Sequence, residues 1–153
     1  MNTRKILFPC DLSTKEAEAL KYAASLARER AAELLIVHVN EPPVVYGEGM
    51  YYYGVPEPDS KAIETMLAAV RPEIADVKYE HRLVDGDPAT EIVALAKREG
   101  VELIVMSSHG RTGLGRLLMG SVAETVMREA ECPVLIVKPK VMDDQKLAVG
   151  RPR

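Results

Sequence analysis

A glycine-rich, basic segment offers the clearest candidate chemistry in this sequence. Residues Ser107–Glu124 read SSHGRTGLGRLLMGSVAE, with four glycines, two arginines, one histidine and three serines. Glycine lets a backbone approach a ligand closely, and successive exposed N–H groups can form a nest for an anion. Arg111, Arg116 and His109 add positive charge to a chain whose net charge is −3. The residue types therefore predict a local site for phosphate groups.

The end of this segment adds a second feature that attracts anions. A helical pattern starts at about Ser121, directly after Gly120, and a helix N-terminus favours an anion by about 0.3–1 kcal/mol. The Walker A motif is excluded because no lysine follows a glycine of the segment. The GxGxxG motif is excluded because four residues separate Gly115 from Gly120. A solvated loop that binds nothing is the alternative interpretation.

Strand-like and helix-like patterns alternate along the chain. Strands are predicted at Lys5–Phe8, Leu34–Val39, Val77–Val84, Val101–Met106 and Val134–Val137. A helical pattern follows each of the first four strands. The first helix is expected to carry an apolar stripe of Ala17, Leu20, Ala24, Ala27 and Ala31.

Capping residues mark the expected ends of these helices. Asp11 to Thr14 supply N-cap chemistry before the first helix. Asp87 followed by Pro88 is interpreted as the cap of the third helix rather than as a ligand contact. Gly100 is expected to end that helix.

This alternation predicts an α/β fold with one doubly wound, five-stranded parallel sheet and helices on both faces. Right-handed crossovers favour the strand order 3-2-1-4-5. Open sheets of this kind bind ligands where the winding direction reverses, at the carboxyl ends of the strands. Two loops flank that point here, Pro9 to Ser13 and Ser107 to Gly120. The glycine-rich segment therefore falls where a ligand site is expected.

The composition limits the classes of function. A chain of 153 residues predicts one domain, which we assign to residues 1–140, followed by a polar tail at residues 141–153. The negative net charge gives no reason to expect nucleic-acid binding, and no apolar run is long enough to span a membrane. Cys10 and Cys132 form no CxxC pair and fit a reducing compartment. We expect a cytoplasmic protein without a structural metal.

The glycine-rich segment resembles the nucleotide loop of the universal stress protein family. ATP-binding members of that family carry G-x2-G-x9-G-[ST] after the fourth strand, which aligns with Ser107, Gly110, Gly120 and Ser121. The first position is serine here, where the pattern has glycine. Serine is strained at that position only if the backbone there requires a positive φ.

The resemblance spans residues 3 to about 138. It includes the element Pro9-x-Asp11-x-Ser13, the pair His38-Val39 at the end of the second strand, and the ending CPVLIVKP. It implies an adenine nucleotide alpha hydrolase-like fold that binds ATP or AMP, and Mg²⁺ could arrive with the phosphates. The implied nucleotide-binding residues are Pro9, Asp11, Val39, Met106, Ser107, Gly110, Arg111, Gly120, Ser121 and Val122.

The implied roles differ along this set. Asp11 would accept hydrogen bonds from the ribose or contact Mg²⁺. Val39 would meet the adenine through its backbone, and Met106 would pack on the sugar or base. Gly120 and its neighbours would hold the phosphates, with Arg111 able to reach the distal ones.

Three functions stay open at this point. The first is an ATP- or AMP-binding regulatory module of the stress response. The second is a weak ATPase, although no residue is placed as a dedicated base and no catalytic residue is predicted. The third is a nucleotide-free dimeric stress protein that acts through its surface.

Two segments are candidates for contacts with a partner. The predicted edge strand Val134–Val137 is apolar on both faces, and an exposed edge of this kind favours uncontrolled association. Pairing with the same strand of a second subunit would cover it. The resemblance implies such a homodimer. Tyr51 to Tyr53 form a tyrosine cluster that fits either a covered apolar surface or a second contact surface.

Overall fold

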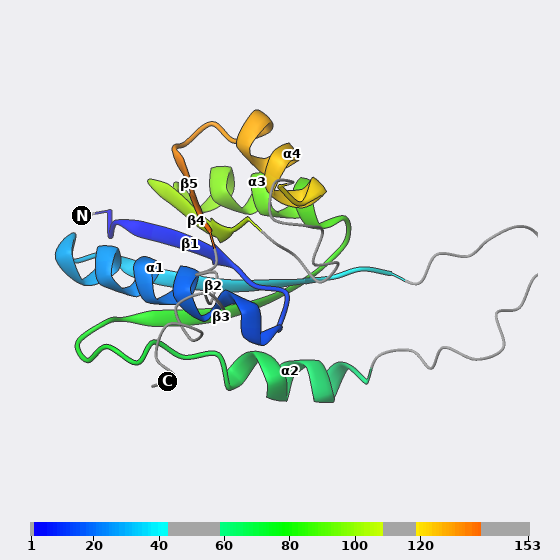
Figure 1. Cartoon of the computed structure of the whole chain (residues 1–153), viewed down its shortest axis with the longest axis horizontal. Coiled ribbons are helices and arrows are strands. Elements are labelled where there is room, and N and C mark those ends of the chain that lie inside the picture. Colours follow the sequence, from blue (N-terminus) through cyan, green and yellow to red (C-terminus); the bar gives the residue numbers. More distant parts are fainter. Residues whose placement is uncertain (1, 43–58, 109–118, 139–153) are drawn as a thin grey trace, which may run out of the picture.

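A five-stranded parallel sheet forms the centre of the molecule (Figure 1). The structure is a computed structural model, and it describes residues 2–42, 59–108 and 119–138. The strand order β3-β2-β1-β4-β5 confirms the predicted order. The strands are β1 Lys5–Pro9, β2 Glu33–Asn40, β3 Tyr79–Asp85, β4 Leu103–Ser107 and β5 Val134–Val137.

Helices cover both faces of this sheet, as predicted. They are α1 Ala17–Glu29, α2 Ser60–Ala68, α3 Pro88–Glu99 and α4 Ser121–Glu129. Helices α1 and α2 lie on one face, and α3 and α4 lie on the other (Figure 1). No helix within the described ranges has the length and apolarity needed to cross a membrane.

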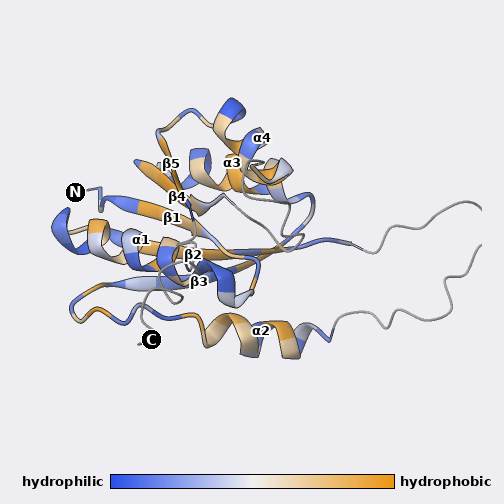
Figure 2. Cartoon of the chain, in the orientation of Figure 1, coloured by the Kyte–Doolittle hydropathy of each residue, from blue (hydrophilic) through white to orange (hydrophobic). Residues whose placement is uncertain are grey.

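The two faces of the sheet form two separate cores. Ile6 and Phe8 of β1 pack toward α1 and α2, whereas Leu7 between them packs toward α3 and α4. Because both faces are covered, the interior positions of the central strands are mostly apolar, and Figure 2 shows this as nearly continuous apolar colour. The predicted α/β layering is therefore explained by burial of both sides of β1.

The alanine stripe of α1 is shifted from its predicted positions. Ala17 and Ala31 are exposed. The buried alanines of the helix are Ala19, Ala23, Ala24 and Ala27. A 3-10 turn at Thr14–Glu16 precedes α1, and the buried side of the helix begins at Glu16 of that turn.

Helix caps follow the sequence in α3 but not in α1. Asp87 Oδ2 accepts a hydrogen bond from the Thr90 N–H at 3.0 Å, and Gly100 ends α3 with φ 63° in the left-handed region. Both expectations are confirmed. The predicted cap of α1 from Asp11 to Thr14 is wrong, because Glu16 is at the N-cap position and no side chain makes a capping hydrogen bond there.

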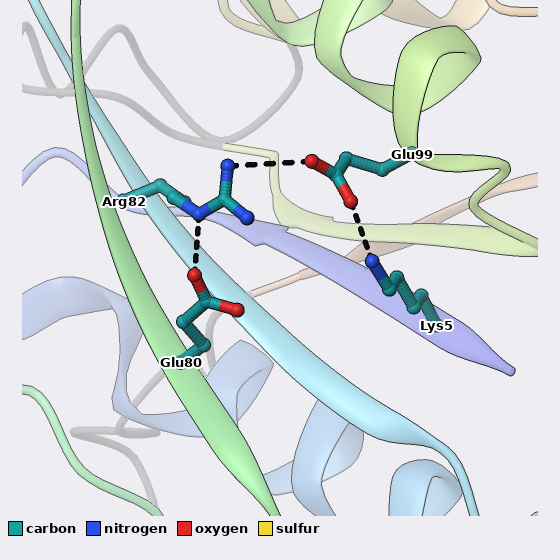
Figure 3. A network of polar contacts seen from close by, with 4 residues as sticks. All are labelled: Lys5, Glu80, Arg82 and Glu99. Carbon is teal, nitrogen blue, oxygen red and sulfur yellow. Dashed lines mark hydrogen bonds and ion pairs between the residues drawn. The ribbon is translucent and has the colours of Figure 1, made fainter. Parts of the chain in front are cut away.

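An ionic network ties β1, β3 and the end of α3 together (Figure 3). Glu99 binds Lys5 through one oxygen and Arg82 Nη1, at 3.3 Å, through the other. Arg82 Nε also donates to Glu80 Oε1 at 2.6 Å. Hydrogen bonding to Lys5, helped by the charges of Lys5 and Arg82, lowers the pKa of Glu99.

Replacing Glu99 by glutamine should destabilise the fold at neutral pH by about 1 kcal/mol. The lowered pKa of Glu99 means that its contribution exists above the unfolded-state pKa and is lost as the pH falls through the folded-state pKa. Urea unfolding of both proteins should therefore show the difference at pH 7 and little difference at acid pH. The exposed Glu64→Gln on α2 is the control, and an equal loss at both pH values would contradict this account.

Candidate functional site

The candidate site lies at the carboxyl ends of β1 and β4. These strands are neighbours in the sheet, yet the chain leaves β1 toward α1 on one face and leaves β4 toward α4 on the other (Figure 1). The loop after β1 and the segment after β4 therefore diverge at this edge. Divergence of this kind creates the crevice in which open α/β sheets bind ligands.

Ser107 is the last residue of β4 and is compatible with a normal backbone. It pairs with Val137 of β5 and is 7% exposed. Within the described ranges, residues other than glycine have positive φ at Leu12, Ala31 and Asp76, so Ser107 does not. Serine in place of the motif glycine therefore causes no backbone strain here.

Two backbone hydrogen bonds fix the start of α4 beside the end of β4. Ser108 N–H donates to Val137 O at 3.1 Å, and Gly120 N–H donates to Ser108 O at 2.9 Å. The first bond of the helix then runs from Glu124 N–H to Gly120 O. The N–H groups of the first turn of α4 have no carbonyl within the helix to bind, and Ser121 at that turn is exposed.

The loop after β1 is held against β2. Cys10 N–H donates to Val37 O at 2.8 Å, and the His38 Nδ1 lies 2.8 Å from Cys10 O, which can accept its proton. His38 is 6% exposed, as expected for a core histidine. Leu12 has φ 67°, a left-handed conformation that costs a non-glycine residue about 1–2 kcal/mol. Contacts from outside the loop must therefore hold this conformation.

Asp11 and Glu16 make the remaining contacts of this loop. Asp11 N–H donates to Glu16 Oε2 at 3.0 Å, and Asp11 Oδ1 accepts the Ser13 N–H at 2.8 Å. Asp11 Oδ2 and Ser13 Oγ are buried and have no hydrogen-bond partner among the described residues. A buried acceptor without a donor is costly. Asp11 Oδ2 is therefore a candidate acceptor for a hydrogen bond from a ligand.

Burial controls the protonation of the two groups beside Asp11. Burial and then the charge of Asp11 raise the pKa of Glu16 to about 8. Burial, followed by the charge of Glu16, raises the pKa of Cys10 to about 12. Cys10 is therefore a thiol at neutral pH and a poor nucleophile.

The apolar residues of the predicted site lie on the α3 and α4 side of the sheet. Val39 is 9% exposed and Met106 is 6% exposed, and both belong to the core on that side. Val122 of α4 packs against the same core. Pro9 ends β1 opposite Val37. The structure thus brings the ends of β1, β2 and β4 and the start of α4 to one edge.

A cavity of about 190 Å³ lies on the opposite side of β1. Its walls include Phe8, Leu20 and Val70, with Arg71 and Glu16 among its polar lining residues. It therefore lies on the α1 and α2 side, away from Val39 and Met106, and Glu16 faces it. The sequence did not predict this cavity.

Some predicted site residues lie outside the described residues. These are Gly110 and Arg111, together with Tyr51 to Tyr53 and the tail at residues 141–153. Among the residues that the structure describes, no group of three His, Cys, Asp or Glu side chains is arranged to hold a metal ion. A Mg²⁺ contact by Asp11 would therefore depend on ligand oxygens, as is common for this ion.

Glu16 is the residue that the sequence interpretation missed. Its side chain is 8% exposed and contacts Asp11. The spacing of Glu16, Ala19, Ala23 and Ala27 follows the buried side of a helix. An acidic residue in line with that stripe was the available signal.

This chain is similar in sequence and in structure to known proteins of one family. The model of the family described as "Universal stress protein family" matches residues 2–138. Universal stress protein MJ0531 of Methanocaldococcus jannaschii is 37% identical over 140 residues, which cover 88% of this chain and 82% of that protein.

Two solved structures are also similar. One is a universal stress protein in complex with cAMP, with a TM-score of 0.67, 25% identity, and coverage of 92% of this chain and 100% of the other. The second is a universal stress protein from Archaeoglobus fulgidus in complex with dAMP. It has a TM-score of 0.62 and 25% identity, and the similarity covers 90% of this chain and 100% of that one.

The raised pKa of Glu16 predicts that stability falls as the pH rises. A raised folded-state pKa contributes stability that is complete below the unfolded-state pKa, near 4.5, and is lost as the pH rises through about 8. Glu16→Gln should remove this dependence and should be more stable than the native chain above pH 8, by on the order of 3 kcal/mol. Urea unfolding between pH 5 and 9, with the exposed Glu29→Gln as control, measures the effect; parallel curves for all three proteins would contradict it.

Proposed function

Because this chain belongs to the universal stress protein family, we propose that it binds an adenine nucleotide at the carboxyl ends of β1 and β4 and acts as a regulatory module of the stress response. The observation that carries the proposal is the buried Asp11 Oδ2, which lacks a partner among the described residues at this edge. The similar proteins in complex with cAMP and dAMP support an adenine nucleotide as the ligand.

Each part of a nucleotide has a matching group in the proposed site. A ribose hydroxyl would donate to Asp11 Oδ2. The phosphates would accept hydrogen bonds from the N–H groups at the start of α4, where Gly120 leaves the backbone uncovered and the helix dipole favours negative charge. The adenine would lie at the end of β2 against the backbone of Val39, with Met106 beside the sugar.

The phosphate end of the site would extend beyond the described residues. We propose that Ser107, Gly110 and Arg111 complete it, and that Ser121 and Val122 contribute from α4. We further propose ATP or AMP as the nucleotide, with Mg²⁺ held between Asp11 and the phosphates when ATP binds. A single carboxylate with phosphate oxygens and water is an ordinary Mg²⁺ environment.

The proposed role is regulation rather than rapid turnover, and we assign no catalytic residue. Occupancy of the crevice would connect the loop after β1 to the start of α4, which lie on opposite faces of the sheet. Nucleotide state would then alter the surfaces around both elements. We place this module in the cytoplasm and assign it to residues 1–140; the free thiols of Cys10 and Cys132 fit a reducing compartment.

Substitutions at the start of α4 should abolish binding of AMP and of Mg²⁺-ATP. Gly120→Val would cover the N–H groups, and Ser121→Glu would place a carboxylate where phosphate binds. Calorimetric titration should show at least a tenfold loss of affinity, about 1.4 kcal/mol or more, with an unchanged circular dichroism spectrum.

A matched control tests whether charge at any helix start has this effect. Ser60→Glu introduces the same charge at the exposed first residue of α2 and should leave binding unchanged. Unaltered affinity in both α4 variants would place the nucleotide elsewhere. Absence of binding by the native protein at millimolar nucleotide, and of nucleotide released on denaturation, would reject the proposal itself.

We also propose that the chain forms a homodimer through β5. This strand is at the edge of the described sheet, and Leu135 on it is 36% exposed. Met127 of α4, which packs against this part of the sheet, is 50% exposed. An apolar edge of this kind favours uncontrolled association unless another strand or chain covers it.

A charge on the edge strand should convert the dimer into monomers. Leu135→Lys places a desolvated cation in the proposed interface, so light scattering at micromolar concentration should report half the native mass. Tyr22→Lys changes an exposed apolar residue of α1 and should leave the mass unaltered. A native protein that scatters as a monomer would rule out the dimer.

A further inference from the structure

We propose that Glu16 is a positioning residue for the nucleotide, which acts by holding Asp11 in its binding conformation. The inference rests on the proposed function, because it gives Asp11 Oδ2 a ligand hydroxyl to bind. It concerns Glu16 itself, a residue of the 3-10 turn before α1.

The hydrogen bond between Glu16 and the Asp11 backbone is the first support. Glu16 Oε2 accepts the Asp11 N–H at 3.0 Å, from a side chain that is only 8% exposed. No ion pair to Glu16 occurs among the described residues. A carboxyl group buried without a cation is costly. The contact that offsets this cost is the one to the loop at the Asp11 N–H.

The conformation of the loop shows why it needs such a contact. Leu12, between Asp11 and Ser13, is in the left-handed region with φ 67°, which a leucine adopts only when its surroundings impose it. His38 holds the loop at Cys10 O, and Glu16 holds it one residue later at the Asp11 N–H. Asp11 then holds the Ser13 N–H with Oδ1. The chain of contacts leaves Oδ2 as the oxygen for a ligand.

A glutamine can reproduce the contacts of Glu16, whereas a leucine cannot. The glutamine amide oxygen can accept the Asp11 N–H, as Glu16 Oε2 does in the native chain. Leucine fills a similar volume but offers no acceptor. It also removes a buried carboxyl group, so the leucine variant should fold at least as stably as the native chain.

The test compares AMP with 2′,3′-dideoxy-AMP, which lacks the ribose hydroxyls. Glu16→Leu should weaken AMP binding about tenfold and leave dideoxy-AMP binding nearly unchanged, whereas Glu16→Gln should keep native affinity for both. Leu20→Ala lines the same cavity and should lower thermal stability without changing the ratio of the two affinities. In an Asp11→Ala background, Glu16→Leu should have no further effect on AMP binding.

A measurement without nucleotide completes the test. Amide hydrogen exchange at Asp11 should be faster in Glu16→Leu than in the native chain and should return to the native rate in Glu16→Gln. Native AMP affinity in Glu16→Leu, or an equal loss for both nucleotides, would overturn the positioning role while leaving the proposed function intact. A native protein that binds neither nucleotide would instead reject the proposed function, and with it a nucleotide role for Glu16.

Discussion

The pairing of β1 with both β2 and β4 is the constraint on which the rest of the molecule depends. It places β1 in the middle of the sheet, buried on both sides, and makes the chain wind away from it in two directions. The helices after β1 and β4 must then cover opposite faces. The candidate site follows from this topology, since the connections after adjacent strands separate at one edge.

The arrangement of strands could be predicted from the sequence because local signals agreed with one another. Apolar runs, helical periodicity and the helix caps at Asp87 and Gly100 all favoured the same elements. The bounds of β5 were predicted without error, and those of the other strands differ by one or two residues at one or both ends. Strand order alone is enough to predict the position of the candidate site.

The details that were missed depend on contacts between distant segments. The left-handed backbone of Leu12 belongs to a loop that is held against β2, and no local pattern encodes that contact. The Glu99 network joins residues that are far apart in the chain. Whether serine is strained at position 107 depends on the backbone φ there, and the sequence does not reveal whether that position needs glycine.

The hydrogen bond between Gly120 N–H and Ser108 O has a consequence for how this fold can diversify. It brings together the residue after β4 and the residue before α4, so the sheet and α4 hold both ends of this connection. Lengthening a closed loop costs little, about 0.6 kcal/mol for each doubling. A change in the length of the connection therefore need not disturb strand register or either core.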